Sequence, residues 1–174
     1  MAANKYLALD PTTLLPKETF ATETSAGGAN ANQIVALNTA GFLDSTLFPA
    51  GFGEASQIFP ASEALAAGAM VNVWSNAGVA NARNANATDA TKFAQGFVVA
   101  AVAALANATV YFPGQIVTGV AGLTIGAAVF LSAATSGAVT STAPVAAGNL
   151  VQQVGFAVSA TSFVFNPAPG IIHG

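Results

Sequence analysis

The sequence predicts an all-β protein, a small antiparallel β-barrel or β-sandwich preceded by a long extended N-terminal arm. Residues 61–168 contain short runs rich in Val, Phe, Thr and Tyr, which are residue types that strands prefer. Turn formers such as Asn76-Ala77-Gly78, Pro113-Gly114 and Ser136-Gly137 separate these runs at intervals typical of a sandwich or barrel. Residues 1–60, in contrast, show no sustained hydrophobic period.

The N-terminal segment, residues 1–60, has small apolar clusters separated by turn formers such as Asp10-Pro11 and Gly27-Gly28. Such a segment cannot bury its own apolar groups in a compact core. A linker would carry Gly, Ser and charge without regularly spaced Leu and Phe, so we expect an arm whose apolar side chains dock on a partner. The candidate anchors are Leu7, Leu9, Leu14, Leu15, Phe20, Ile34, Val35, Leu37, Phe42, Leu43, Leu47, Phe48 and Phe52.

The β domain is expected over residues 61–168, followed by a flexible tail at residues 169–174. Residues 82–92 are ambiguous, because Ala favours helix but Asn84, Asn86 and Thr88 weaken that preference. We expect a loop with one helical turn there. The predicted strand runs are 70–74, 96–103, 108–112, 115–118, 127–131, 138–142, 151–159 and 162–166.

Charge is scarce and unevenly distributed. Asp, Glu, Lys and Arg make up 6% of the 174 residues, against roughly 25% in an average soluble domain, and residues 93–174 contain none of them. A soluble surface normally keeps charge, so we expect identical neighbours to cover part of this domain in a homo-oligomer, with a trimer favoured. The net charge of −3 argues against a nucleic-acid partner, because nothing would neutralise the phosphates.

A membrane partner is the competing explanation for a mean hydropathy of +0.61. The two most apolar stretches, 97–112 and 119–134, are shorter than the roughly 20 residues that a spanning helix needs. Polar residues and glycines interrupt them, and no Lys or Arg flanks them. The first residues, MAANKYLALD, do not have the apolar core of a secretory signal. We therefore expect no membrane association.

The sequence has no catalytic motif, so neither an enzyme nor a cofactor nor a metal site is expected. There is no cysteine, the one histidine is His173 near the end, and no carboxylate follows Asp89. Trp74 lies in an alternating run and is interpreted as a core or interface residue rather than a ligand platform. For Arg83, Asp89 and Lys92, a solvated loop face and ion pairs between subunits both remain open.

A resemblance to a known family appears at residues 33–53, QIVALNTAGFLDSTLFPAGFG. This text is similar to a segment of tailed-bacteriophage virion proteins that joins an N-terminal part to a β domain. The later runs ALAAGAMVNVW, QGFVVAAVA, ATVYFPG, GLTIGAAVFLS, GAVTSTAP and VQQVGFAVSATSFVFNP resemble phage head proteins and some tail-fibre modules. The resemblance covers residues 33–167 and contains no catalytic signature.

The resemblance implies a capsid decoration (cement) protein that stabilises the capsid exterior. Such proteins are often trimers, with an arm bridging subunits of the major capsid protein and a β-barrel or β-tulip domain. The location would be the virion surface, after synthesis in the host cytoplasm. The long N-terminal segment supports a second hypothesis, a tail-fibre, baseplate or head-fibre component.

Overall fold

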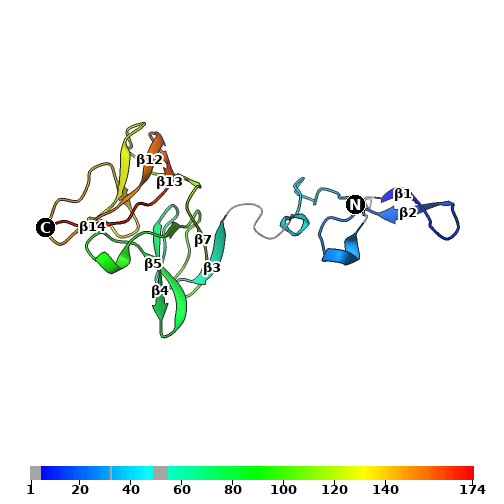
Figure 1. Cartoon of the computed structure of the whole chain (residues 1–174), viewed down its shortest axis with the longest axis horizontal. Coiled ribbons are helices and arrows are strands. Elements are labelled where there is room, and N and C mark those ends of the chain that lie inside the picture. The colour runs from blue at the N-terminus through cyan, green and yellow to red at the C-terminus, as the bar shows by residue number, and fades with distance from the viewer. Residues whose placement is uncertain (1–4, 32, 49–54) are drawn as a thin grey trace. The chain divides into compact units, whose positions relative to one another are not determined.

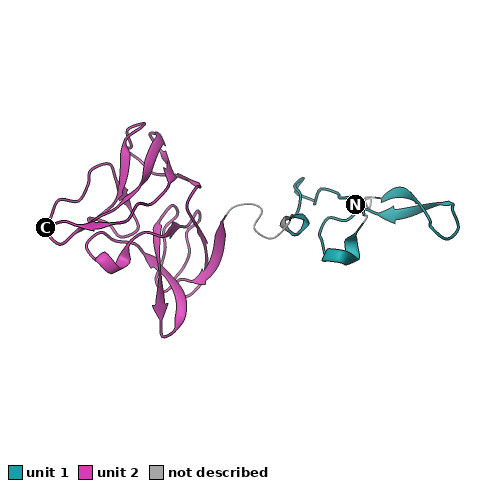
Figure 2. Ribbon diagram, in the orientation of Figure 1, with its two compact units in different colours: residues 1–53 teal, residues 54–174 magenta. Residues whose placement is uncertain are grey.

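The computed structural model describes residues 5–31, 33–48 and 55–174, which fall into two compact units, residues 1–53 and 54–174 (Figure 2). The regular elements of the described residues are β-strands and short 3-10 helices, without an α-helix. All strands pair antiparallel within their sheets. The predicted all-β class is therefore confirmed.

The N-terminal unit is not one extended arm, because the chain folds back on itself. Strand β1 (Lys5–Leu9) pairs with β2 (Pro16–Phe20) over the full length of both strands. Two 3-10 turns follow, η1 (Gly27–Asn30) and η2 (Ser45–Leu47). The local cause of the reversal is Asp10, whose carboxylate accepts the backbone N–H groups of Thr12 and Thr13. The expectation of an extended arm is therefore wrong for residues 5–20, which form a hairpin.

The first sheet of the second unit has the strand order β3-β7-β6-β4-β5, and it curls until its two edges meet. Ala61, just after β3, forms a bridge with Ala82 of β5, and the Ser62 N–H donates to the Ala82 carbonyl at 2.8 Å. The sheet therefore curls into a half-barrel whose two edges meet at Ala61 and Ala82. Its strands are β3 (Ser56–Pro60), β4 (Met70–Asn76), β5 (Val79–Asn84), β6 (Gly96–Phe97) and β7 (Asn107–Tyr111), with η3 (Ala90–Lys92) after β5.

The second sheet has the order β10-β9-β12-β13-β8, and a two-stranded ribbon β11-β14 joins the chain end to this unit (Figure 1). Ile171 and Ile172 pair with Val151 and Leu150, so the predicted flexible tail is in part a strand held by backbone hydrogen bonds. The strands are β8 (Ile116–Thr118), β9 (Ala128–Leu131), β10 (Val139–Thr140), β11 (Leu150–Val151), β12 (Gln153–Ser159), β13 (Ser162–Phe165) and β14 (Ile171–Ile172).

Two apolar clusters form the core of the second unit. The larger one contains Phe97, Phe163 and Phe165 among its buried side chains, and the rings of Phe97 and Phe165 meet edge to face at 5.6 Å. The smaller cluster lies inside the curled sheet and contains Leu65 and Val110. Both clusters are made mainly of Ala, Val, Leu and Phe. Strand β4 contributes to both, because its successive residues Met70 and Val71 point to opposite faces and are both buried.

Local turn chemistry accounts for the hairpin between β4 and β5. Its two loop residues, Ala77 and Gly78, both have positive φ, at 51° and 86°. Two left-handed residues between antiparallel strands give the twist of a type I′ turn. The turn at residues 76–78 was expected from the sequence, whereas strand β5 itself lies partly in the predicted loop 82–92.

The compact unit starts at Glu54, before the expected boundary at residue 61, because β3 pairs with β7. The predicted run 96–103 is a strand only at Gly96 and Phe97. After Phe97 the chain leaves the sheet, and Val102 forms an isolated bridge with Leu65. The apolar residues between 98 and 106 are therefore a loop, not a strand.

We predict that Gly155→Ala destabilises the second unit strongly. A Cβ atom at this position would overlap the carbonyl oxygen of Val164 on the neighbouring strand, so β12 and β13 would have to move apart. The free energy of unfolding should fall by about 3 kcal/mol in urea denaturation. The control is Gly122→Ala, where the backbone has a positive φ but open space surrounds the new methyl group, and this variant should cost about 1 kcal/mol. Equal losses for the two variants would contradict the close-approach argument.

Candidate partner-binding surface

The two faces of the β1–β2 hairpin differ in exposure. Side chains alternate along each strand, so Leu7, Leu9 and Phe20 share a face and are exposed. On the other face, Tyr6 and Ala8 are only half-exposed. The hairpin therefore presents three large apolar side chains on its more exposed face.

The ammonium group of Lys5 lies at the end of this apolar face. The Lys5 Nζ lies 2.7 Å from Glu18 Oε2 and 5.2 Å from the centroid of the Phe20 ring. Both charged side chains are substantially exposed, so the pair adds little to stability. The ion pair holds the Lys5 ammonium group beside the Phe20 ring, so a positive charge adjoins the exposed apolar side chains.

The hairpin tip presents two further leucines. Leu14 has a φ of 58°, in the left-handed region that Gly or Asn adopts most easily, and its side chain is 68% exposed. Its N–H donates to the Asp10 carbonyl at 2.9 Å, and the Asp10 N–H donates to the Leu15 carbonyl. The backbone is thus fixed while both leucine side chains face outward. This is an unusual position for a bulky apolar residue, because the strain gives no internal contact in return.

The other predicted anchors of the N-terminal unit can be placed individually. Leu47 is half-buried, and Phe52 lies outside the described residues. All the remaining candidates are exposed, which is the property expected of partner contacts. These exposed side chains are Leu7, Leu9, Leu14, Leu15, Phe20, Ile34, Val35, Leu37, Phe42, Leu43 and Phe48.

This exposure is the main functional signal in the N-terminal unit. A two-stranded hairpin is at best marginally stable alone in water. Soluble monomers rarely leave many large apolar side chains together on the surface, and such surfaces mark interaction sites. We call the exposed apolar side chains of residues 5–48 the N-terminal apolar surface. It is the best candidate in the described chain for binding another macromolecule.

Trp74 and Arg83 belong to an internal polar network of the second unit. The guanidinium carbon of Arg83 lies 4.8 Å from the Trp74 ring centroid, and the indole Nε1–H donates to Ser62 Oγ. Arg83 Nε donates to Asn72 Oδ1 at 2.9 Å, and its terminal nitrogen donates to the Thr91 carbonyl. These bonds hold the loop after β5 against β4, so Arg83 acts within its own chain.

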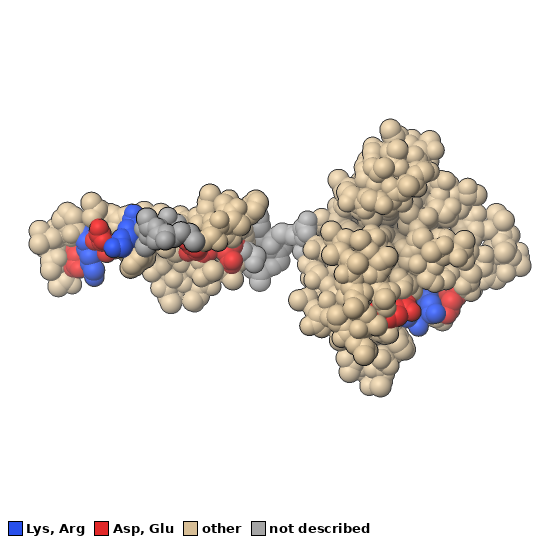
Figure 3. Space-filling model, turned by 180° about the vertical axis from the view of Figure 1, so that it is seen from behind, with Lys and Arg blue, Asp and Glu red and all other residues tan. Residues whose placement is uncertain are grey.

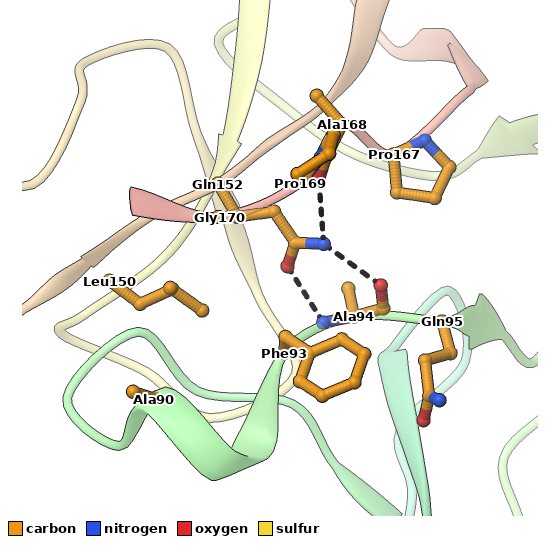
Figure 4. A pocket seen from close by; sticks show the side chains of 10 residues that line it. All are labelled: Ala90, Phe93, Ala94, Gln95, Leu150, Gln152, Pro167, Ala168, Pro169 and Gly170. Carbon is orange, nitrogen blue, oxygen red and sulfur yellow. Dashed lines mark hydrogen bonds between the residues drawn. The ribbon is translucent and has the colours of Figure 1, made fainter. Parts of the chain in front are cut away.

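A pocket of about 480 Å³ lies between residues 90–95 and 167–170 of the second unit (Figure 4). Gln152 is 2% exposed, and its amide accepts from the Ala94 N–H and donates to the Ala94 and Ala168 carbonyls. Because these three bonds occupy the amide, Gln152 joins two segments of the fold rather than offering a group to a ligand.

The described residues do not bring together the groups that metal binding would require. No three His, Cys, Asp or Glu side chains cluster there. His173 is exposed, and its ring contacts only the neighbouring Gly174 carbonyl among the hydrogen bonds found. Within the described segments, no helix has the length and hydropathy to cross a lipid bilayer.

Comparisons with known proteins give no relative for this chain. No protein-family model, no curated protein and no solved structure matches it.

The hairpin tip should lose order in acid. The N–H groups of Thr13 and then Thr12 hold the pKa of Asp10 below its ordinary value of 3.8. A carboxyl whose pKa is lowered by folding stabilises the structure above pH 3.8, and that contribution disappears as the pH falls through the folded-state value. We expect the amide resonances of Thr12 and Thr13 to move toward random-coil positions below about pH 4. Asp10→Asn should remove this transition, and its persistence in that variant would contradict the assignment.

Proposed function

We propose that this chain is a non-enzymatic structural protein of a tailed-bacteriophage virion, which decorates the capsid exterior and stabilises it. In this proposal the N-terminal unit binds and bridges subunits of the major capsid protein. The β unit contacts copies of itself, with a homotrimer as the favoured assembly. The protein is made in the host cytoplasm and functions on the virion surface.

The N-terminal apolar surface is the observation that carries the proposal. Its unit is built on one hairpin and two 3-10 turns among the described residues, and it leaves Leu7, Leu9 and Phe20 exposed on one sheet face. A partner that covers this face would complete a core that the unit does not make alone. The resemblance of residues 33–167 to phage head proteins supplies the class of partner.

The proposed action is mechanical. Each large side chain that becomes fully buried in a capsid groove contributes on the order of 1.5–3 kcal/mol. The cost of ordering the bound segment opposes this gain, and a preformed hairpin lowers that cost because its backbone is already fixed. Backbone pairing between a hairpin edge and a capsid strand would add to the affinity. A segment bound across two subunits then raises the work needed to separate them.

The composition of the second unit supports a structural role. Glu63, Arg83, Asp89 and Lys92 are its only charged side chains among residues 55–174. Figure 3 shows charged side chains of this unit gathered at one edge of the visible face, with the rest of that face uncharged. Contacts between such surfaces bury no ionic group, so they should persist at high salt.

A tail-fibre, baseplate or head-fibre component is the second candidate function. The N-terminal unit of 53 residues, joined to a separate compact unit, also suits a protein that is attached at one end. The number of copies per virion separates the two proposals. Hundreds of copies, measured by band intensity against the major capsid protein on a gel of purified virions, support decoration. Tens or fewer support a fibre or baseplate role.

The N-terminal apolar surface should determine capsid binding. We predict that the double variant Leu7→Thr/Leu9→Thr keeps the hairpin, because Thr suits strands, but binds capsids lacking this protein at least tenfold more weakly. The expected loss is the removal of two buried leucines from the interface. Affinity is measured by co-sedimentation with the capsids. The matched control is Ala8→Thr on the opposite face of the same strand, which should bind like wild type. Undiminished binding of the double variant would exclude this face as the capsid contact.

A further inference from the structure

Residues 167–174 form a segment that lies along one side of the second unit and contains strand β14, and we call this segment the strap. Every residue of the strap except Pro167 is exposed, and the side chains of Ile171 and Ile172 are 72% and 61% exposed. The strap therefore buries little apolar surface of its own. Backbone hydrogen bonds, rather than apolar contacts, hold it to the unit.

The first attachment point of the strap is Ala168. Its N–H donates to the Gln153 carbonyl at 2.9 Å, and its carbonyl accepts from Gln152 Nε2 at 3.2 Å (Figure 4). Both neighbours of Ala168 are prolines, Pro167 and Pro169, which have no N–H to donate. At this end of the strap, Ala168 is therefore the backbone donor among residues 167–169.

The second attachment of the strap is the ladder between β14 and β11. The His173 N–H donates to the Asn149 carbonyl, and the Gly148 N–H donates to the His173 carbonyl, each at 2.8 Å. Hydrogen-bonded and non-bonded pairs alternate along an antiparallel ladder, so the N–H of Ile172, one residue before His173, points away from β11. The His173 N–H therefore takes part in this ladder, whereas the Ile172 N–H does not.

The strap covers part of the larger apolar cluster. Gly170 lies directly against Leu150, because a Cβ atom at Gly170 would overlap Leu150 Cδ1. Leu150 is 5% exposed and belongs to that cluster. The strap also forms one wall of the pocket of about 480 Å³, across from residues 90–95. Opening of the strap would therefore uncover Leu150, the edge of β11 that faces β14 and the amide N–H of Gln152 together.

We propose that the strap opens and closes as one unit while the rest of the second unit stays folded. Segments open locally when they have few buried apolar contacts and backbone hydrogen bonds near solvent, and the strap meets both conditions. The boundary lies just before it, because Phe165 is fully buried and its N–H donates to the Gln115 carbonyl. The closed strap covers an apolar residue and a strand edge, and an uncovered edge favours pairing with other chains. The opening is a property of the protein alone and is independent of the capsid proposal.

Hydrogen exchange of the wild-type chain tests the opening without any substitution. The amides of Ala168 and His173 should exchange with similar protection factors, because one event breaks both hydrogen bonds. Their protection should be about a hundredfold lower than that of Phe165, which exchanges only when the unit unfolds. Three results contradict the proposal: protection equal to that of Phe165, protection that differs more than about tenfold between Ala168 and His173, and no protection at either amide.

Thiol labelling tests whether the opening uncovers Leu150. The chain has no cysteine, so Leu150→Cys supplies a single thiol beneath the strap. Leu131→Cys is the matched control, because Leu131 belongs to the same cluster, is 0% exposed and does not line the pocket. In native buffer, Leu150→Cys should react with an aromatic disulfide reagent about tenfold faster than Leu131→Cys, or faster still. Equal labelling rates would overturn the proposal.

Proline substitutions separate the bonds of the strap from a general loss of stability. Adding His173→Pro to Leu150→Cys removes the N–H that donates to Asn149 and should speed labelling about tenfold, the effect of one lost hydrogen bond. Adding Ile172→Pro instead removes an N–H that points away from β11, so labelling should stay at the rate of Leu150→Cys alone. No acceleration by His173→Pro, or the same acceleration by both prolines, would contradict the opening of the strap.

Discussion

Hydrogen bonds between uncharged groups connect the segments of residues 93–174, because these residues include no Asp, Glu, Lys or Arg. The amide of Gln152 is the centre of this arrangement, since it is buried and links Ala94 to Ala168 across two segments distant in sequence. The carboxamide of Asn72 performs a similar task between β4 and the loop after β5. No buried side-chain nitrogen or oxygen of the described residues is left without a partner. The fold therefore satisfies its buried polar side chains with few charged groups, of which Arg83 is one.

The surface of the molecule also carries many apolar side chains. Both buried clusters consist mainly of Ala, Val, Leu and Phe, yet many Val, Leu and Phe side chains are exposed to solvent. Leu14 and Leu105, one in each unit, are both exposed and both held at positive φ by backbone hydrogen bonds. Polar or glycine residues would relieve the strain at either position. Each placement therefore costs some stability without gaining an internal contact.

The N-terminal apolar surface suits a larger partner, because its hairpin offers both apolar side chains and the outer edges of a two-stranded sheet. The proposed decoration of a capsid would supply such a partner, and many weak contacts would act together there.

The sequence by itself determined the all-β class and the turn at residues 76–78, because short strand runs and turn residues act locally. The lack of a hydrophobic period also indicated that the N-terminal segment cannot bury its own large apolar side chains, and most of those described are exposed. Only the tertiary structure decided that β1 and β2 form a hairpin, that β5 closes on Ala61, and that the apolar run after Phe97 leaves its sheet. These features depend on which distant strand is available for pairing, and a local pattern of side chains does not contain that information.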